Sequence, residues 1–204
     1  MRLILVRHGK TDWNETGRCQ GISDVPLNLG GIEQAEKLAL SLKDESIDRI
    51  YSSDLARAKT TAEKIAAYHS IDVNVRNDLR EMDQGILEGL DFSYIREKYS
   101  DVLEHWRNDP ETLQLPGGEA LSGVQQRALD AVADIKSRFG SQNIVIVSHN
   151  LVIGTLLCRF AGSSLKEFRD YMVDEASKSV VEIYDDRFII ISFNDIGHLR
   201  PPGE

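Results

Sequence analysis

The sequence predicts an α/β fold in which helices cover both faces of a mostly parallel β-sheet. Two short segments rich in branched apolar residues, Leu3 to Val6 and Asn143 to Val147, are typical of strands buried on both faces. Strand-like and helix-like segments alternate along most of the chain, as in βαβ units. Two further strand-like runs near the end are joined by a tight turn, which indicates an antiparallel hairpin at one edge. We therefore expect a three-layer α/β/α sandwich with an antiparallel edge element.

Hydrophobic periodicity and breaker residues place the individual elements. Asp54 is a plausible N-cap for the helix that includes Ala58 to Ile65. The expected strands are Leu3 to Val6, Ile47 to Ser52, Asp72 to Val75, Asn143 to Val147, Ser179 to Tyr184 and Phe188 to Phe193, the last two joined by Asp185-Asp186-Arg187. The other expected helices are Gly30 to Leu42, a polar helix from Phe92 to Asn108, Leu121 to about Arg138, and Val152 to Phe160.

Length and composition favour one domain. The chain has 204 residues, of which 41% are hydrophobic and 28% charged, enough for one substantial core and too few for two ordinary domains. Neither a Gly/Ser-rich tract nor an internal repeat marks a linker. We therefore expect residues 1–204 to fold as a single domain.

Charge and cysteine usage exclude several classes of function. The net charge of −9 argues against nucleic acid or an acidic membrane surface as a partner. The first expected strand begins near the first residue, so we expect no signal peptide, and no apolar run reaches the ~20 residues of a membrane span. Cys19 and Cys158 lie in unrelated settings and are expected to be free thiols of a cytoplasmic protein.

Polar residues follow three of the expected parallel strands. Arg7-His8 follows the first strand, Arg57 lies shortly after the second, and His149-Asn150 follow the strand that ends at Val147. In such sheets ligands bind outside the carboxyl ends of the strands, so these groups are expected to meet at one edge. Arg57 and Asn150 also fall in the first turns of helices, where free N–H groups favour an anion. The sequence therefore predicts an anion site with a nucleophile in it, which Glu81 could approach from a non-helical stretch.

Five blocks of sequence, in order, resemble the histidine phosphatase superfamily, also called phosphoglycerate-mutase-like. The blocks are Leu3 to Gly9 followed by Thr11, Trp13, Asn14, Arg18, Gln20 and Gly21; Tyr51 to Ala62; Glu81 with Gly85 and Gly89; Pro116 to Glu119; and Val147 to Asn150. The similarity covers the chain from Arg2 to about Gly162. An isolated Arg-His-Gly tripeptide would carry little weight, but five blocks in the right order make coincidence improbable.

The resemblance implies a role for each residue of the predicted site. His8, as a neutral imidazole, would attack phosphorus and form a phosphohistidine, and Glu81 would protonate the leaving group and then activate water. Arg7, Arg57 and a protonated His149 would surround the phosphoryl oxygens. The substrate-binding set is Arg7, Asn14, Gln20, Gly21, Arg57, Glu81, His149 and Asn150. Neither a metal nor another cofactor is expected. A zinc site built on His8 and His149 is the alternative, although a carboxylate-and-arginine cluster would replace its third ligand.

The segment after Glu81 favours the phosphatase branch of the superfamily. Mutases of the family resemble this chain through the catalytic blocks, but carry a longer, more basic segment there. Residues 91–119, which we expect to form a helical segment on the substrate side, hold seven acids and the three bases Arg96, Lys98 and Arg107. The segment resembles that of α-ribazole phosphatase and metal-independent phosphoserine phosphatase. We expect a phosphomonoester hydrolase of a small metabolite, with a phosphoglycerate mutase and a non-catalytic phospholigand-binding domain as alternatives.

Several assignments stay open at the level of sequence. His105 is expected on a helix surface or on a lid over the substrate, and His198 either on the surface or near the substrate. The residues from Phe92 to Pro116 would decide which monoester is the substrate, but their spacing does not identify it. The edge of the terminal hairpin could pair with a second subunit to form a homodimer.

Overall fold

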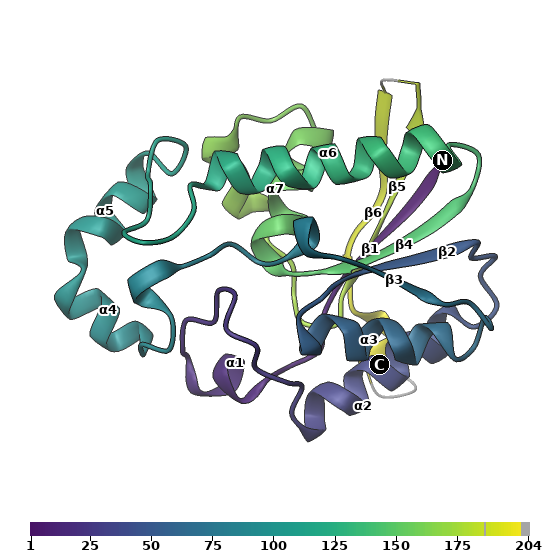
Figure 1. Ribbon diagram of the computed structural model, residues 1–204, viewed down its shortest axis with the longest axis horizontal. Coiled ribbons are helices and arrows are strands. Elements are labelled where there is room, and N and C mark those ends of the chain that lie inside the picture. The colour runs from purple at the N-terminus through teal and green to yellow at the C-terminus, as the bar shows by residue number, and fades with distance from the viewer. Residues whose placement is uncertain (186, 201–204) are drawn as a thin grey trace.

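The computed structural model describes residues 1–185 and 187–200, and Figure 1 shows its architecture. The strands are β1 (Arg2–Arg7), β2 (Arg49–Ser53), β3 (Val73–Arg76), β4 (Asn143–Ser148), β5 (Lys178–Tyr184) and β6 (Arg187–Asp195). The α-helices are α1 (Asp12–Thr16), α2 (Leu29–Leu42), α3 (Ala56–Ala66), α4 (Phe92–Lys98), α5 (Ser100–Asn108), α6 (Leu121–Phe139) and α7 (Asn150–Phe160). Short 3-10 helices span Asn77–Leu79, Gly85–Leu87, Leu165–Tyr171 and Gly197–Leu199.

The described strands form one sheet in the order β3-β2-β4-β1-β5-β6. The four strands from β3 to β1 pair in parallel, whereas β5 pairs antiparallel with both β1 and β6. β1 and β4 lie side by side at the centre with Arg7 opposite Ser148, so both chains leave the sheet at the same edge. The expected mostly parallel sheet with an antiparallel edge element is confirmed.

Helices cover both faces of the sheet, as expected for a three-layer sandwich. In Figure 1, α6 and α7 lie on one side of the strands and α2 and α3 on the other. Leu3 and Leu5 of β1 pack in the core with α6 and α7, while Ile4 and Val6 pack in the core with α2 and α3. Successive side chains of a strand point to opposite faces. An unbroken apolar run is therefore what a central strand between two helical layers requires.

The segment after Glu81 departs from the expected single helix. The helix stops at Lys98 and a second one begins at Ser100, because Tyr99 has φ −125° and ψ 36°, outside the helical region. The resulting pair, α4 and α5, lies beyond the end of the sheet in Figure 1. Polar composition predicted the helices but gave no signal for the break between them.

The expected N-cap of α3 is wrong. Leu55, not Asp54, is the capping residue, and it has no side chain that can accept a hydrogen bond. The carboxylate of Asp54 is instead bound by Arg80, whose Nε lies 2.7 Å from Asp54 Oδ1. A nearby arginine therefore outcompeted the free N–H groups of the helix for this carboxylate. The Ala56 N–H that α3 leaves free donates to Asp24 Oδ1 at 2.7 Å.

The terminal hairpin forms the outer edge of the sheet, with β6 as its last strand. Asp186, in the middle of the expected connection, lies outside the described residues. Exposed apolar side chains alternate along β6 at Ile189, Ile191 and Phe193. Pairing of this edge with a second subunit remains a prediction. None of the helices in the described part of the chain combines the length and apolar character needed to span a bilayer.

Candidate active site

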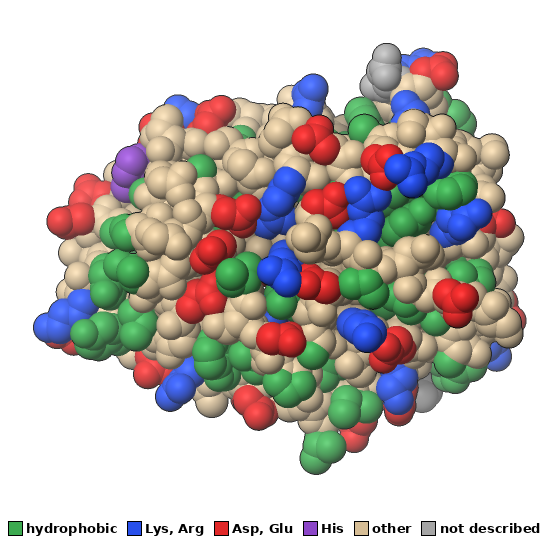
Figure 2. Space-filling view, in the orientation of Figure 1, with side chains coloured by type: hydrophobic (Ala, Val, Ile, Leu, Met, Phe, Trp, Pro, Cys, Tyr) green, Lys and Arg blue, Asp and Glu red, His purple; other side chains and the backbone are tan. Residues whose placement is uncertain are grey.

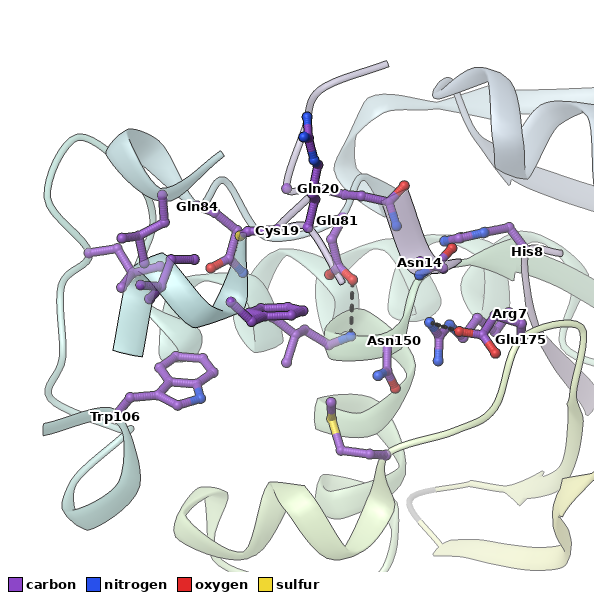
Figure 3. Close-up of a pocket in the computed structure, with 18 of the residues that line it drawn as sticks. Arg7, His8, Asn14, Cys19, Gln20, Glu81, Gln84, Trp106, Asn150 and Glu175 are labelled. Atoms are coloured by element: carbon purple, nitrogen blue, oxygen red, sulfur yellow. Dashed lines mark hydrogen bonds and ion pairs between the residues drawn. The ribbon is translucent and has the colours of Figure 1, made fainter. Parts of the chain in front are cut away.

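A cavity of about 400 Å³ opens at the carboxyl ends of the central strands. Figure 3 shows Arg7 and His8 at one end, Trp106 at the other, and Cys19 and Glu81 between them. Side chains from the end of β1, the loop before α2, the start of α3, the Glu81 loop and the start of α7 line the first end. The expected meeting of strand ends is therefore found, with its polar groups at one end of an elongated cavity.

A tight backbone approach fixes the turn that carries His8. The His8 N–H donates to Ser148 O of the neighbouring strand at 3.1 Å, and the Gly9 N–H donates to Thr61 Oγ1 at 3.2 Å. A Cβ on Gly9 would lie 2.4 Å from Gly31 O, so only glycine fits between the turn and α2. The turn is thereby held to β4, α2 and α3 at once.

The His8 ring is oriented by its own turn. Its Nδ1 lies 2.6 Å from Gly9 O. A carbonyl oxygen only accepts, so Nδ1 carries the proton and Nε2 keeps a free lone pair. Burial, followed by the positive charges of Arg57 and Arg7, holds the pKa of His8 well below its usual value. The neutral tautomer needed for attack through Nε2 is thus the resting state.

Arg7 and Arg57 are buried cations held by backbone carbonyls. Arg57 Nη1 and Nη2 donate to Ser23 O and Gly21 O, both at 2.8 Å. Arg7 Nη1 donates to Val173 O at 2.5 Å, and its Nη2 pairs with Glu175 at 3.0 Å. In both side chains the buried Nε finds no partner among the described residues. Each guanidinium therefore keeps unused N–H donors that a phosphoryl oxygen would satisfy.

His149 is fully buried, and its ring centroid lies 5.1 Å from that of His8. Neither of its ring nitrogens has a partner within the described residues. The expected protonation of His149 beside a phosphoryl group stays a prediction. Burial first, and then the charge of Arg57, hold the pKa of His149 well below its usual value, which favours the neutral ring in the empty site. A bound anion would supply the opposite charge that raises this pKa.

Glu81 has the environment expected of a proton donor. Its Oε1 accepts from the Met82 N–H at 2.8 Å and its Oε2 from the Leu151 N–H at 3.3 Å. Burial raises the pKa of Glu81 above its usual value, although these two hydrogen bonds and the nearby Arg57 oppose the shift. The carboxyl group therefore lies closer to the pH range in which it can both give and take a proton.

Two amides line the same end of the cavity in fixed orientations. The Thr11 N–H donates to Asn14 Oδ1 at 3.0 Å, and Thr11 Oγ1 lies 2.9 Å from both Asn14 Oδ1 and Gln20 Oε1. With the oxygens occupied, both NH2 groups remain available as donors. Asn150 behaves in the same way, because its Oδ1 accepts from the Val173 N–H at 2.9 Å.

The comparisons with known proteins agree with this geometry. A sequence model of the histidine phosphatase superfamily (branch 1) matches residues 3–196. The chain belongs to this superfamily. Phosphoserine phosphatase 1 of Hydrogenobacter thermophilus is 34% identical over 199 residues, which cover 98% of this chain and 94% of that protein.

Two further relatives show the range of the superfamily. A probable phosphoglycerate mutase, GpmB, of Salmonella choleraesuis is 31% identical, with 99% of this chain and 96% of that protein covered. The structure of a putative α-ribazole-5′-P phosphatase from Escherichia coli superimposes with a TM-score of 0.87 at 29% identity, covering 96% of both chains. Membership and these relatives make the chain a phosphatase of the superfamily with the expected fold.

Two histidines left open by the sequence lie outside the cavity of this histidine phosphatase. His105 is exposed on α5, with Nε2 3.1 Å from Thr112 Oγ1. His198 lies with Nε2 3.0 Å from Ala176 O and is also absent from the lining. The described residues contain no group of three His, Cys, Asp or Glu side chains arranged to hold a metal. No such group therefore includes His8 and His149 in the part of the chain that the structure describes.

Sequence reasoning missed Glu88 as a support of the phosphatase site. Its Oε1 accepts from the Ile22 N–H at 2.8 Å, and its Oε2 accepts from the Ser23 N–H at 2.9 Å and Ser23 Oγ at 2.6 Å. The same loop supplies the two carbonyls that hold Arg57. Gly21 has φ +53°, and a Cβ there would meet the Glu88 carboxylate at 1.9 Å. Glu88 therefore positions Arg57 through the backbone, a role with no local sequence signature.

Proposed function

We propose that this enzyme hydrolyses a small phosphate monoester through a phosphohistidine on His8. The convergence of four side chains from separate segments on one cavity carries the proposal: they are Arg7, His8, Arg57 and Glu81. The buried His149 lies behind this lining, with its ring centroid 5.1 Å from that of His8. Free thiols at Cys19 and Cys158 support a reducing compartment such as the cytoplasm. The partner is the monoester itself, because the net charge of −9 opposes nucleic acids and acidic membranes.

In the first step, His8 Nε2 forms a bond to phosphorus as the bond to the ester oxygen breaks. Protonated Glu81 gives its proton to the departing oxygen, which leaves as a neutral alcohol. The imidazole becomes cationic, and Gly9 O, 2.6 Å from Nδ1, accepts the more acidic N–H. The unused donors of Arg7 and Arg57 stabilise the equatorial oxygens.

In the second step, the Glu81 carboxylate takes a proton from water while the water oxygen attacks phosphorus. The bond between phosphorus and Nε2 breaks, its electron pair returns to His8, and orthophosphate is released. Glu81 ends protonated and His8 neutral, which are their starting states. One carboxyl group thus acts first as acid and then as base, which a raised pKa favours.

His149 would acquire its positive charge from the substrate. A phosphate dianion placed against its unpartnered nitrogens favours the imidazolium, and the burial that keeps the empty site neutral then strengthens the ion pair. The charge would appear only when a phosphoryl group is present.

Charge around the cavity supports hydrolysis over the mutase alternative. Beyond Arg7 and Arg57, the described lining contains one more cation, Arg18, whose Nε lies 3.3 Å from Asp91 Oδ1. A second phosphate of a bisphosphate would compete with Asp91 for a single exposed guanidinium. Water is therefore the better supported acceptor.

The test is phosphate release from a panel of phosphorylated metabolites, with His8→Ala as the control. We expect release by the native protein, persistence of activity in a chelator, inhibition by vanadate, and a phosphoryl group on the His8 peptide after rapid quenching. Isomerisation of phosphoglycerates faster than phosphate release would select the mutase. No release from any panel member, with unchanged ligand affinity in His8→Ala, would select the binding domain, and loss of activity in the chelator would revive the zinc alternative.

A further inference from the structure

The end of the cavity away from His8 is an apolar chamber, which we define by Ile95, Val102, Leu103, Trp106 and Met172. Phe92, Leu87, Leu115 and Leu151 complete its walls. The first four chamber residues come from the helical pair α4–α5, and Met172 follows the 3-10 helix Leu165–Tyr171. Figure 3 shows Trp106 across the cavity from Arg7 and His8, with Glu81 between the two ends.

The charges of the acidic segment do not reach this chamber. None of the seven Asp and Glu residues between 91 and 119 lines the cavity. The acids of α4 and α5 instead lie on the exposed side of the helices, as Glu97, Asp101 and Glu104 are all exposed. Figure 2 shows acidic and basic side chains interspersed over one face of the molecule, with no field of a single sign. The acidic residues of the helical pair therefore lie on its solvent-facing side, and the side that faces the cavity is apolar.

Trp106 is a fixed wall of the chamber. Its indole packs edge-on against the buried Phe168, with ring centroids 5.3 Å apart. Its carbonyl accepts a hydrogen bond from Arg169 Nη2 at 2.5 Å, and the Arg169 guanidinium lies 4.8 Å from the centroid of the Phe168 ring. A preorganised aromatic surface loses little side-chain entropy when it binds an apolar group.

We propose that the leaving group of the physiological substrate is an apolar or ring-bearing alcohol that occupies this chamber, and that amino-acid and sugar-acid monoesters are poor substrates. The inference rests on the proposed function and narrows it. With phosphorus at His8 Nε2 and the ester oxygen at Glu81, the rest of the molecule extends towards Trp106. A zwitterionic leaving group such as that of phosphoserine would lose hydration among these chamber residues, none of which is charged.

The test compares monoesters of primary alcohols whose leaving groups have similar acidity: ethyl, butyl, hexyl and benzyl phosphate, with phosphoserine beside them. Because the chemistry is matched, differences in kcat/KM report on the chamber. We expect kcat/KM to rise by up to about fourfold for each methylene that the chamber buries, and to be at least about tenfold higher for hexyl or benzyl phosphate than for phosphoserine. Equal or higher activity on phosphoserine would overturn the proposal.

Variants separate the chamber from the phosphate end. Trp106→Ala is expected to lower kcat/KM for hexyl and benzyl phosphate by about tenfold, with less than about a twofold change for ethyl phosphate. Met172→Gln, which keeps the volume and adds a polar group, should act in the same direction from a different element. Tyr94→Ala is the matched control, because this aromatic residue of α4 is exposed and absent from the cavity lining.

The outcomes distinguish this proposal from the one on which it rests. Equal losses on all esters in Trp106→Ala and Met172→Gln would mean that the chamber acts on stability and not on substrate choice. A preference for phosphoserine that is lost in Arg18→Gln would place the substrate at the Arg18 side of the cavity. Both outcomes would contradict the chamber proposal and would leave the proposal of hydrolysis through His8 unaffected. If none of the esters released phosphate, both the proposed hydrolysis and the chamber proposal would be wrong.

Discussion

The two ends of the cavity are built in opposite ways. The phosphate end consists of single residues contributed by strand ends and helix starts. Backbone hydrogen bonds hold His8 and Arg57, whereas the ring nitrogens of His149 and the two arginine Nε atoms have no partner among the described residues. The chamber consists of the inner faces of two short helices and has mostly apolar walls. The phosphate end is ordered by specific polar contacts that tolerate little change, whereas the chamber is ordered by packing, which tolerates changes that conserve volume. The two proposals above therefore predict that chemistry and substrate choice can be changed separately.

The sharpest challenge to this separation is removal of the nucleophile. His8→Ala is expected to lower phosphate release by about 10³-fold or more on every ester, polar or apolar, because the proposed covalent intermediate forms on His8. Initial rates with ethyl and hexyl phosphate measure it. His105→Ala, which removes an exposed histidine of α5, should change both rates by less than about twofold. A His8→Ala enzyme that keeps its rate on one ester class would show that the two ends do not share one mechanism.

Replacing the proton donor tests whether the phosphate end responds to the acidity of the leaving group. Glu81→Gln is expected to lower kcat by about 10²–10³-fold for ethyl phosphate and much less for p-nitrophenyl phosphate, whose leaving group needs no proton. Glu104→Gln, an exposed carboxylate of α5, is the control.

The pH dependence of the native enzyme also tests whether Glu81 is the proton donor. His8 must be neutral, and its pKa is lowered, so the acid limb lies below the ordinary histidine value of 6.5. Glu81 must begin protonated, and its pKa is raised above 4.5, so activity falls as the pH rises through that higher value. This alkaline limb should disappear in Glu81→Gln. If it persisted, Glu81 would not be the group that transfers the proton.

A smaller effect is expected when the loop that holds Arg57 is loosened. Glu88→Gln removes the charge that fixes the N–H groups of Ile22 and Ser23, so Arg57 should bind oxyanions about tenfold more weakly, a loss comparable to that of a charge-assisted hydrogen bond. The inhibition constant of vanadate measures this loss. The ratio of hexyl to ethyl phosphate hydrolysis should stay constant, because Glu88 does not line the chamber. A changed ratio would show that the two ends are mechanically coupled.

The smallest effect is expected for Cys19, which lies between the two ends of the cavity. Burial, followed by the negative charge of Glu88, raises the pKa of Cys19 to about 12. At pH 8 the thiol is therefore protonated and a poor nucleophile. Cys19→Ser should change kcat/KM by less than about twofold, and iodoacetamide at that pH should leave the native enzyme active. Rapid inactivation that Cys19→Ser prevents would show a more open junction than the structure describes.

The sequence was informative for features that depend on neighbouring residues. It was uninformative for features that depend on contacts between residues far apart in the chain. Leu3 to Gly9 predicted the buried strand, the strand end and the nucleophile, because burial and turn formation are local properties. Glu81 could be placed because it belongs to a recognisable block. Asp54 was assigned wrongly as an N-cap because its competitor, Arg80, lies far away in sequence. Glu88 gave no signal, since its partners include backbone N–H groups that lie far from it in sequence.

The substrate end illustrates the same limit. Within residues 91–119, α4 and α5 are helical and contribute to the lining of the cavity, and the assignment of this segment to the substrate side stays a prediction. Their composition suggested an acidic wall, but composition does not say which face of a helix points inward. Packing of the helical pair on the core, including that of Trp106 on Phe168, turns its apolar face towards the cavity.

The unpartnered nitrogens of His149 also have a consequence for the product. Buried polar groups without partners raise the free energy of the empty site, and orthophosphate offers the oxygens that they lack. Product should therefore remain bound after hydrolysis, so that the cellular phosphate level tunes the rate of turnover. The same ligand should protect the fold, and the melting temperature of the enzyme should rise with orthophosphate concentration as linkage requires. A melting temperature that does not change with phosphate concentration would mean that the His149 nitrogens do not bind orthophosphate.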